Sequence, residues 1–148
     1  MSIYGPLEDL VYWKRCQSLI AVLPSNVSVE YLGEVNPSSV MEVFSAFELF
    51  VLPTFGENYG HVVLECLTSG TPVLISDQTP WDPSDDGAVL VLPLGDSSSW
   101  AVALDRHAQM SADERLKMKL LAVNYARNYR QSSSVVEQTS NLFHSLLR

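Results

Sequence analysis

Basic residues are scarce over most of this chain. The first 105 residues contain fourteen acidic side chains but only two basic ones, Lys14 and Arg15, and the whole chain carries a formal net charge of −8. A protein that binds a polyanion needs a dense cationic surface. The charge pattern therefore argues against a nucleic-acid partner.

Cysteine is nearly as scarce. The chain has two cysteines, Cys16 and Cys66, which cannot form a disulfide framework and match no zinc-binding spacing. Because both lie in apolar stretches, we expect buried, reduced thiols. The three histidines form no cluster with them, so we expect no metal site, and we expect His107 and His144 on helix surfaces.

Long apolar runs are also missing. No run approaches the roughly 18 residues that cross a membrane. Glu8, Asp9, Lys14 and Arg15 fall where a secretory signal peptide would need its apolar core. We therefore expect a cytoplasmic protein. No Walker loop, Gly-x-Gly-x-x-Gly or Gly-x-Ser-x-Gly motif occurs, which disfavours P-loop, dinucleotide-dependent and hydrolase functions.

Short β-rich runs alternate with helical stretches along the chain. This alternation predicts a parallel sheet with right-handed crossovers. Two of the runs, residues 49–52 and 73–76, are continuously apolar, as expected for strands covered on both faces. The expected fold is a single α/β domain over residues 1–148, with a Rossmann-like parallel sheet, flanking helices and a helical tail from about residue 97. Strands are expected at 2–4, 27–32, 49–52, 73–76 and 89–92, and helices at 7–23, 37–47, 60–69, 113–129 and 135–147.

The loop from Pro53 to His61 is the richest place for a ligand. Ligands of parallel sheets lie outside the carboxyl ends of the strands. The first amides of a helix starting near Gly60 would be unpaired and suit a phosphate, and Gly60 would let a ligand approach the backbone. Glu57 lies in this loop, and Glu65 follows in the helix. An ionised carboxylate accepts from two adjacent hydroxyls, so the combination favours a sugar nucleotide.

These residues carry a family resemblance. The run Glu57-Asn58-Tyr59-Gly60-His61-Val62-Val63-Leu64-Glu65, followed by Gly70-Thr71-Pro72-Val73, closely resembles the Glu-x7-Glu signature of family 4 glycosyltransferases. These are retaining enzymes of the GT-B fold that use nucleotide sugars. Residues 3–6, 29–35 and 76–81 also resemble the C-terminal, donor-binding half of that fold.

The resemblance implies roles for individual residues. Glu57 would be the catalytic residue facing the donor sugar, and Glu65 would accept the ribose hydroxyls. The remaining donor-binding positions would be the Gly33-Glu34-Val35 turn against the nucleobase and Asn58, Tyr59, Gly60, His61 and Val62 near the sugar and diphosphate. The nucleotide diphosphate sugar would be a substrate, and neither a cofactor nor a metal is implied. The expected process is polysaccharide or glycan biosynthesis.

The chain also departs from that family. Complete members have an N-terminal acceptor domain and a basic loop that grips the diphosphate, and nothing here corresponds to them. We therefore expect a donor-binding part truncated at its N-terminus, whose glycan or lipid-linked acceptor would need the missing domain. The alternative is a non-catalytic nucleotide-sugar-binding or interaction subunit of a split transferase, with self-association through an exposed sheet edge.

Two other features leave alternatives open. Trp81 would either line the acceptor side of a cleft or cover the sheet edge. The basic residues towards the C-terminus form either a solvated helix face or a peripheral membrane contact; they are Arg115, Lys117, Lys119, Arg127 and Arg130.

Overall fold

The computed structural model describes residues 1–132 of the chain. The chain divides into two compact units, Met1–Val40 and a second that begins at Met41. The expectation of a single domain stays a prediction. The helix expected at 135–147 and His144 lie outside the described residues.

The first unit contains a two-stranded parallel sheet. Strand β1 (Ser2–Ile3) pairs with β2 (Glu30–Tyr31), and helix α1 (Leu10–Ile20) connects them. The helix begins later than expected because Asp9 caps it, accepting hydrogen bonds from the amides of Val11 and Tyr12 at 2.8 and 2.9 Å. Cys16 is half-buried rather than buried, so that expectation was wrong.

The second unit contains a three-stranded parallel sheet in the order β3-β4-β5. The short 3-10 helix η1 (Pro37–Ser39) lies at the end of the first unit, and helix α2 (Val40–Ser45) follows it and precedes strand β3 (Phe50–Leu52). Strands β4 (Val73–Ser76) and β5 (Val89–Leu92) have the bounds that the sequence predicts. The central strand β4 is fully buried, whereas β3 is only half-buried because it lies at an edge of this sheet.

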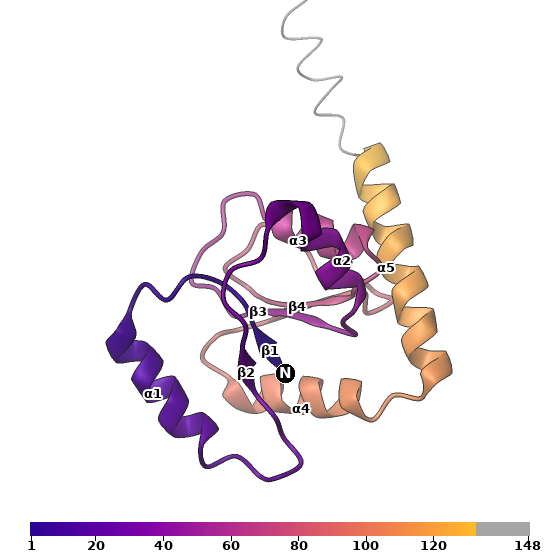
Figure 1. The fold of residues 1–148 in the computed structure, drawn as a ribbon. Helices are drawn as coiled ribbons and strands as arrows, with labels where there is room; N and C mark the ends of the chain where they lie inside the picture. The colour runs from indigo at the N-terminus through magenta and orange to yellow at the C-terminus, as the bar shows by residue number, and fades with distance from the viewer. Residues whose placement is uncertain (133–148) are drawn as a thin grey trace, which may run out of the picture. The chain divides into compact units, whose positions relative to one another are not determined.

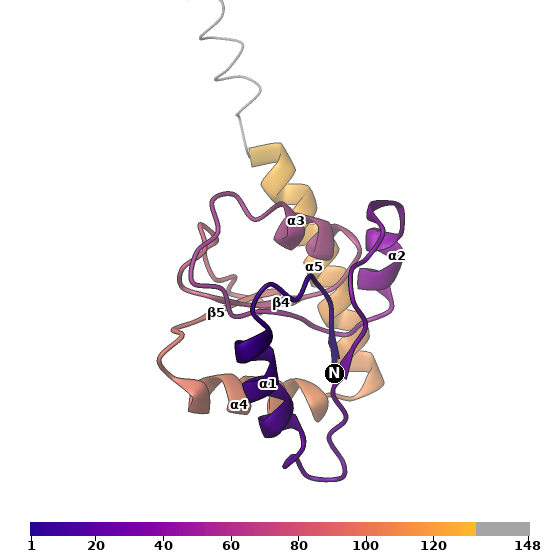
Figure 2. The ribbon, with the colours of Figure 1, turned by 60° about the vertical axis from the view of Figure 1, so that its left-hand side comes forward.

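Helices cover both faces of this sheet. Helix α3 (His61–Thr68) lies on one face and α4 (Ser97–Ala108) on the other, as Figures 1 and 2 both show. The long helix α5 (Ala112–Ser132) packs against α3. The core combines Val63, Cys66 and Leu67 of α3 with the sheet, and with Ala122 and Ala126 of α5. Helix α5 is thus part of the core.

Helix α4 corrects one prediction. His107 is 8% exposed instead of lying on a helix surface. The half-buried residues Trp100, Ala103 and Leu104 precede it at helical spacing, so they form one inward-facing stripe that ends at His107. The Nε2 atom of His107 is buried without a hydrogen-bond partner among the described residues.

Candidate functional site

The candidate site is the loop that leads from the carboxyl end of β3 into α3. Thr54 closes its first turn, with its Oγ1 donating to the carbonyl of Gly56 at 2.8 Å. The buried Ser76, at the end of β4, donates from Oγ to the carbonyl of Thr54 at 2.6 Å. The neighbouring strand therefore fixes where the loop begins.

The carboxylate of Glu57 turns back on its own loop. Its Oε1 accepts hydrogen bonds from the amides of Tyr59 and Gly60, at 3.3 and 3.1 Å. Tyr59 and Gly60 are two of the residues that the family resemblance places near the sugar and diphosphate. A phosphate at the start of α3 would therefore meet the amides of His61 and Val62, which lie in the first helical turn.

Gly60 is the N-cap of α3 and has a left-handed backbone, with φ at 74°. A Cβ at this position would collide with Nε1 of Trp81. The backbone and the packing together thus require glycine here. The Trp81 side chain occupies the space from which a ligand would have approached the α-carbon.

Helix α3 separates an exposed side from a buried one. Its buried residues are Val63, Cys66 and Leu67, whereas His61 and Glu65 are exposed. His61 and Glu65 are four positions apart and share one helix face, with Glu65 about 6 Å along the axis from His61. The rings of His61 and Tyr59 lie 4.3 Å apart at the helix start. Glu65 is therefore free to meet a ligand beside that ring pair.

The other predicted donor-binding residues belong to the first unit. Gly33 follows β2 with φ at 76°, and its carbonyl accepts from the amide of Gly5 at 2.9 Å. Glu34 is exposed and Val35 is half-buried. The structure shows a turn of defined geometry here.

Sequence reasoning left the role of Trp81 open between a cleft and a sheet edge. The structure shows it in the core, with 4% of its surface exposed. Its Nε1 donates to the carbonyl of Tyr59 at 3.1 Å, and its ring stacks on Tyr129 of α5 at 4.5 Å. The sequence held no signal for the contact with Tyr129, which is 48 positions away.

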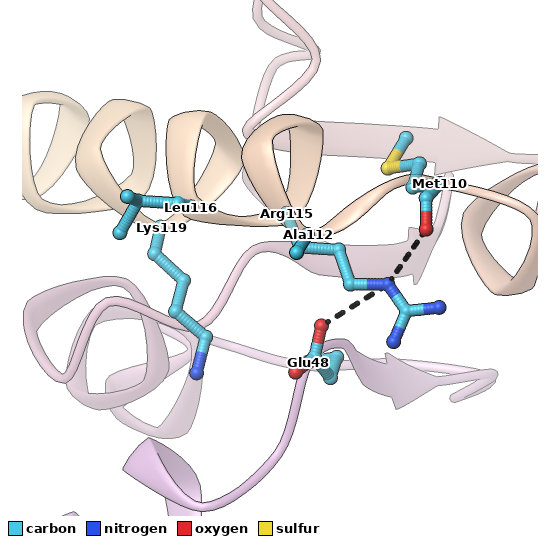
Figure 3. Close-up of a pocket in the computed structure, with 6 residues that line it drawn as sticks. All are labelled: Glu48, Met110, Ala112, Arg115, Leu116 and Lys119. Atoms are coloured by element: carbon cyan, nitrogen blue, oxygen red, sulfur yellow. Dashed lines mark hydrogen bonds and ion pairs between the residues drawn. The ribbon is translucent and has the colours of Figure 1, made fainter.

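A cavity of about 480 Å³ lies elsewhere in the second unit, beside α5 (Figure 3). There Nε of Arg115 lies 3.4 Å from Oε2 of Glu48 and donates to the carbonyl of Met110 at 3.1 Å. Lys119 reaches the carbonyl of Ser45 at 3.4 Å. These contacts hold the chain around α5 together. Arg130 likewise donates to Oγ1 of Thr68 at 3.1 Å, so part of the basic set binds the protein itself.

Comparison with known proteins identifies the family. A family model described as glycosyl transferases group 1 matches residues 2–109, which is more than half of the chain. The chain belongs to this family. The predicted glycosyltransferase resemblance is thus confirmed.

Known glycosyltransferases are similar to this chain in sequence and in fold. The D-inositol 3-phosphate glycosyltransferase of Nocardia farcinica is 33% identical over 114 residues, which are 75% of this chain and 25% of that protein. Sucrose-phosphate synthase from Thermosynechococcus elongatus has a TM-score of 0.76 at 19% identity, covering 99% of this chain and 38% of that one. Anabaena HepE in complex with UDP-glucose has a TM-score of 0.73 at 18% identity, covering 98% of this chain and 40% of that one.

The comparisons show the fold of this chain and how much of each relative it covers. The structural neighbours are GT-B glycosyltransferases, so the predicted α/β fold is confirmed. The chain spans between 20% and 32% of the length of the curated relatives that it matches.

Two kinds of feature are missing from the part of the chain that the structure describes. No helix within residues 1–132 is long and apolar enough to cross a bilayer. In the same part of the chain, no group of three or more metal-ligating side chains gathers around one point.

Proposed function

We propose that the chain is the donor-binding part of a retaining family 4 hexosyltransferase and binds a nucleotide diphosphate sugar at the start of α3. The observation that supports this most is the combination of an open helix start with Glu65 exposed one turn further on. The diphosphate meets the amides of His61 and Val62, where the helix dipole favours negative charge. The carboxylate of Glu65 accepts two ribose hydroxyls.

Glu57 is the proposed catalytic residue. The amides of Tyr59 and Gly60 hold its Oε1 in the loop that precedes the helix start, so the second carboxylate oxygen is the one offered to the donor sugar. Asn58 and Tyr59 are exposed in the same loop and complete the sugar side of the site. The reaction retains the anomeric configuration of the transferred sugar.

The nucleobase is the proposed ligand of the Gly33-Glu34-Val35 turn. Its left-handed glycine leaves open space, because a Cβ at Gly33 would meet nothing within 4 Å. A flat base can lie against such a turn and be read by backbone groups. Uracil, guanine and adenine all remain candidates for the base at this turn.

The remaining parts of the proposal follow the family. The enzyme acts in the cytoplasm, in polysaccharide or glycan assembly, and uses no metal and no cofactor. Its acceptor is a glycan or a lipid-linked sugar. Arg127, which is exposed on α5, would contribute to any contact with an anionic membrane surface.

A second function, a non-catalytic nucleotide-sugar-binding subunit of a split transferase, has one observation in its favour. Over the first 105 residues the only basic side chains are Lys14 and Arg15, and both are exposed on α1. A leaving diphosphate needs preorganised positive charge. In this alternative a partner chain supplies that charge.

Saturation-transfer NMR on the 148-residue chain tests the proposal. UDP-, GDP- and ADP-sugars are added in turn, and Glu65→Ala serves as the control variant. Saturation transfer to one nucleotide sugar, lost in Glu65→Ala, supports the donor site and names the base. No transfer to any of them from a folded chain would contradict a self-sufficient donor site. Hydrolysis of the bound donor by the chain would argue against the non-catalytic alternative.

A further inference from the structure

Trp81 reaches the candidate loop from a different part of the chain. It follows β4, and its indole is almost fully buried in the core of the second unit, at 4% exposure. A buried indole needs a partner for its N–H group. That partner is the carbonyl of Tyr59, at 3.1 Å from Nε1. A core side chain is thus bonded directly to the backbone of the loop.

The peptide unit between Tyr59 and Gly60 is held at both ends. Its carbonyl accepts from Trp81, and its N–H donates to Oε1 of Glu57 at 3.1 Å. In a trans peptide these two groups point in opposite directions. Rotating the unit would break both bonds together. The Trp81 bond therefore helps to fix the carboxylate of Glu57 as well as the peptide.

The indole itself is held in place by packing. Its ring stacks on Tyr129 of α5, with the centroids 4.5 Å apart and the planes at 26°. Tyr125 lies on the same helix, 6.3 Å from the indole. The left-handed glycine at position 60 leaves room for the indole where any Cβ would collide with it. The indole cannot move away from the loop without disturbing α5.

We propose that Trp81 is a positioning residue for the donor site. It locks the orientation of the Tyr59–Gly60 peptide and thereby holds the Glu57 carboxylate and the start of α3 in the geometry that binds the donor. Its effect on donor binding rests on the proposed function. Its effect on the loop does not, so the two are tested separately.

Trp81→Phe is the test variant, because phenylalanine keeps an aromatic ring beside Tyr129 but has no N–H to donate. Trp100→Phe is the matched control. Trp100 also donates from Nε1 to a backbone carbonyl, that of Pro93 at 2.9 Å, and it lies on α4. Both variants lose one indole hydrogen bond, but only one of these bonds reaches the loop.

The first readout is the backbone NMR spectrum of each variant without ligand. Trp81→Phe should shift the amide signals of Tyr59 and Gly60 and speed their hydrogen exchange, whereas Trp100→Phe should leave them unchanged. Unchanged Tyr59 and Gly60 signals in folded Trp81→Phe would overturn the proposal, whatever the chain binds.

The second readout is the affinity for UDP-glucose. Losing one buried hydrogen bond corresponds to roughly a tenfold loss of affinity, which we expect in Trp81→Phe and not in Trp100→Phe. Equal losses of affinity in both variants would mean that Trp81 only stabilises the fold, and this would overturn its positioning role. If the unmodified chain binds no nucleotide sugar while the loop signals still respond to Trp81→Phe, the proposed function fails and the structural role of Trp81 stands.

A third readout needs no variant that could fail to fold. In the unmodified chain, donor binding should slow hydrogen exchange at the Trp81 indole N–H, because it stabilises the locked loop. The indole of Trp100 should exchange as before. A bound donor that leaves the Trp81 indole unaffected would overturn the proposal.

Discussion

Glu57 and Glu48 are carboxylates of the same unit in opposite surroundings. Glu57 accepts hydrogen bonds from two backbone amides where helix α3 begins. No basic side chain within residues 1–132 forms an ion pair with it. Glu48 lies 3.4 Å from the guanidinium of Arg115, beside the cavity of about 480 Å³. Arg115 also donates to the carbonyls of Ala108 and Met110. The cavity therefore marks a structural contact between elements, whereas the surface at α3 has the groups that the proposed donor site uses.

The largest expected effect in the site region is that of Gly60→Ala. An alanine at position 60 would be strained by the left-handed φ, and its Cβ would collide with Trp81. The free energy of unfolding should therefore fall by about 3 kcal/mol. Chemical denaturation measures this. Gly56→Ala is the control, because a Cβ at Gly56 meets nothing within 4 Å, and it should cost no more than about 0.5 kcal/mol. Equal losses in both variants would show that Trp81 does not constrain the loop.

Glu65→Ala should act on binding and leave the fold intact. Losing hydrogen bonds to a charged group should weaken nucleotide-sugar binding by about 2 kcal/mol. Glu65 is exposed, so the melting temperature should barely change. Glu42→Ala removes another exposed helical carboxylate of the second unit and should change neither quantity. Unfolding of Glu65→Ala without an effect on binding would make Glu65 structural. NMR titration and thermal melting measure the two quantities.

His107 should make stability depend on pH. Burial lowers the pKa of His107, while a hydrogen bond to the Glu48 backbone opposes that change. The unfolded chain then binds the proton more readily. Stability is therefore complete above the ordinary histidine pKa near 6.5 and falls as the pH drops through it.

The His107 effect can be measured by denaturation of the chain at pH 8 and pH 5.5. His107→Gln should lose this part of the pH dependence, whereas His61→Gln, at an exposed position, should keep it. An unchanged pH profile in His107→Gln would contradict the assignment.

The smallest expected effect is that of Glu48→Ala. Its partner Arg115 has 35% of its side-chain surface exposed, so the ion pair is largely solvated. We expect a loss of no more than about 0.5 kcal/mol in unfolding free energy, and unchanged donor affinity. A clear loss of donor affinity in Glu48→Ala would place ligand binding at the cavity and reverse the comparison.

The sequence predicted the bounds of helices and strands best where a single local signal determines them. Val73–Ser76 and Val89–Leu92 are apolar runs with turn residues after them, and both strands have the predicted bounds. The helix expected at 60–69 is α3, and Gly70, with a left-handed φ of 85°, lies just beyond its end. The loop between β3 and α3 was also located correctly, because strand and helix signals flank it.

Some predictions failed although a local signal was present, and others because distant contacts decide. His107 was expected on a helix surface, yet Trp100, Ala103 and Leu104 precede it at helical spacing and indicate the same inward-facing stripe. The place of Trp81 depends on Tyr59 and Tyr129, which are 22 and 48 positions away in the sequence. Hydrophobic periodicity carries no information on these two contacts. Helix α1, by contrast, starts three residues after the predicted Leu7 because Asp9 provides the cap, a signal that lies in the local sequence.

The measurement that tests the central proposal most directly is a map of backbone amide shifts in the 148-residue chain during titration with the nucleotide sugar. We expect the largest shifts at His61 and Val62, with further shifts at Glu57 and Glu65. Signals around Arg115 and Lys119 should stay unchanged. Shifts centred on Arg115 and Lys119, with His61 and Val62 unaffected, would contradict a donor site at the start of α3.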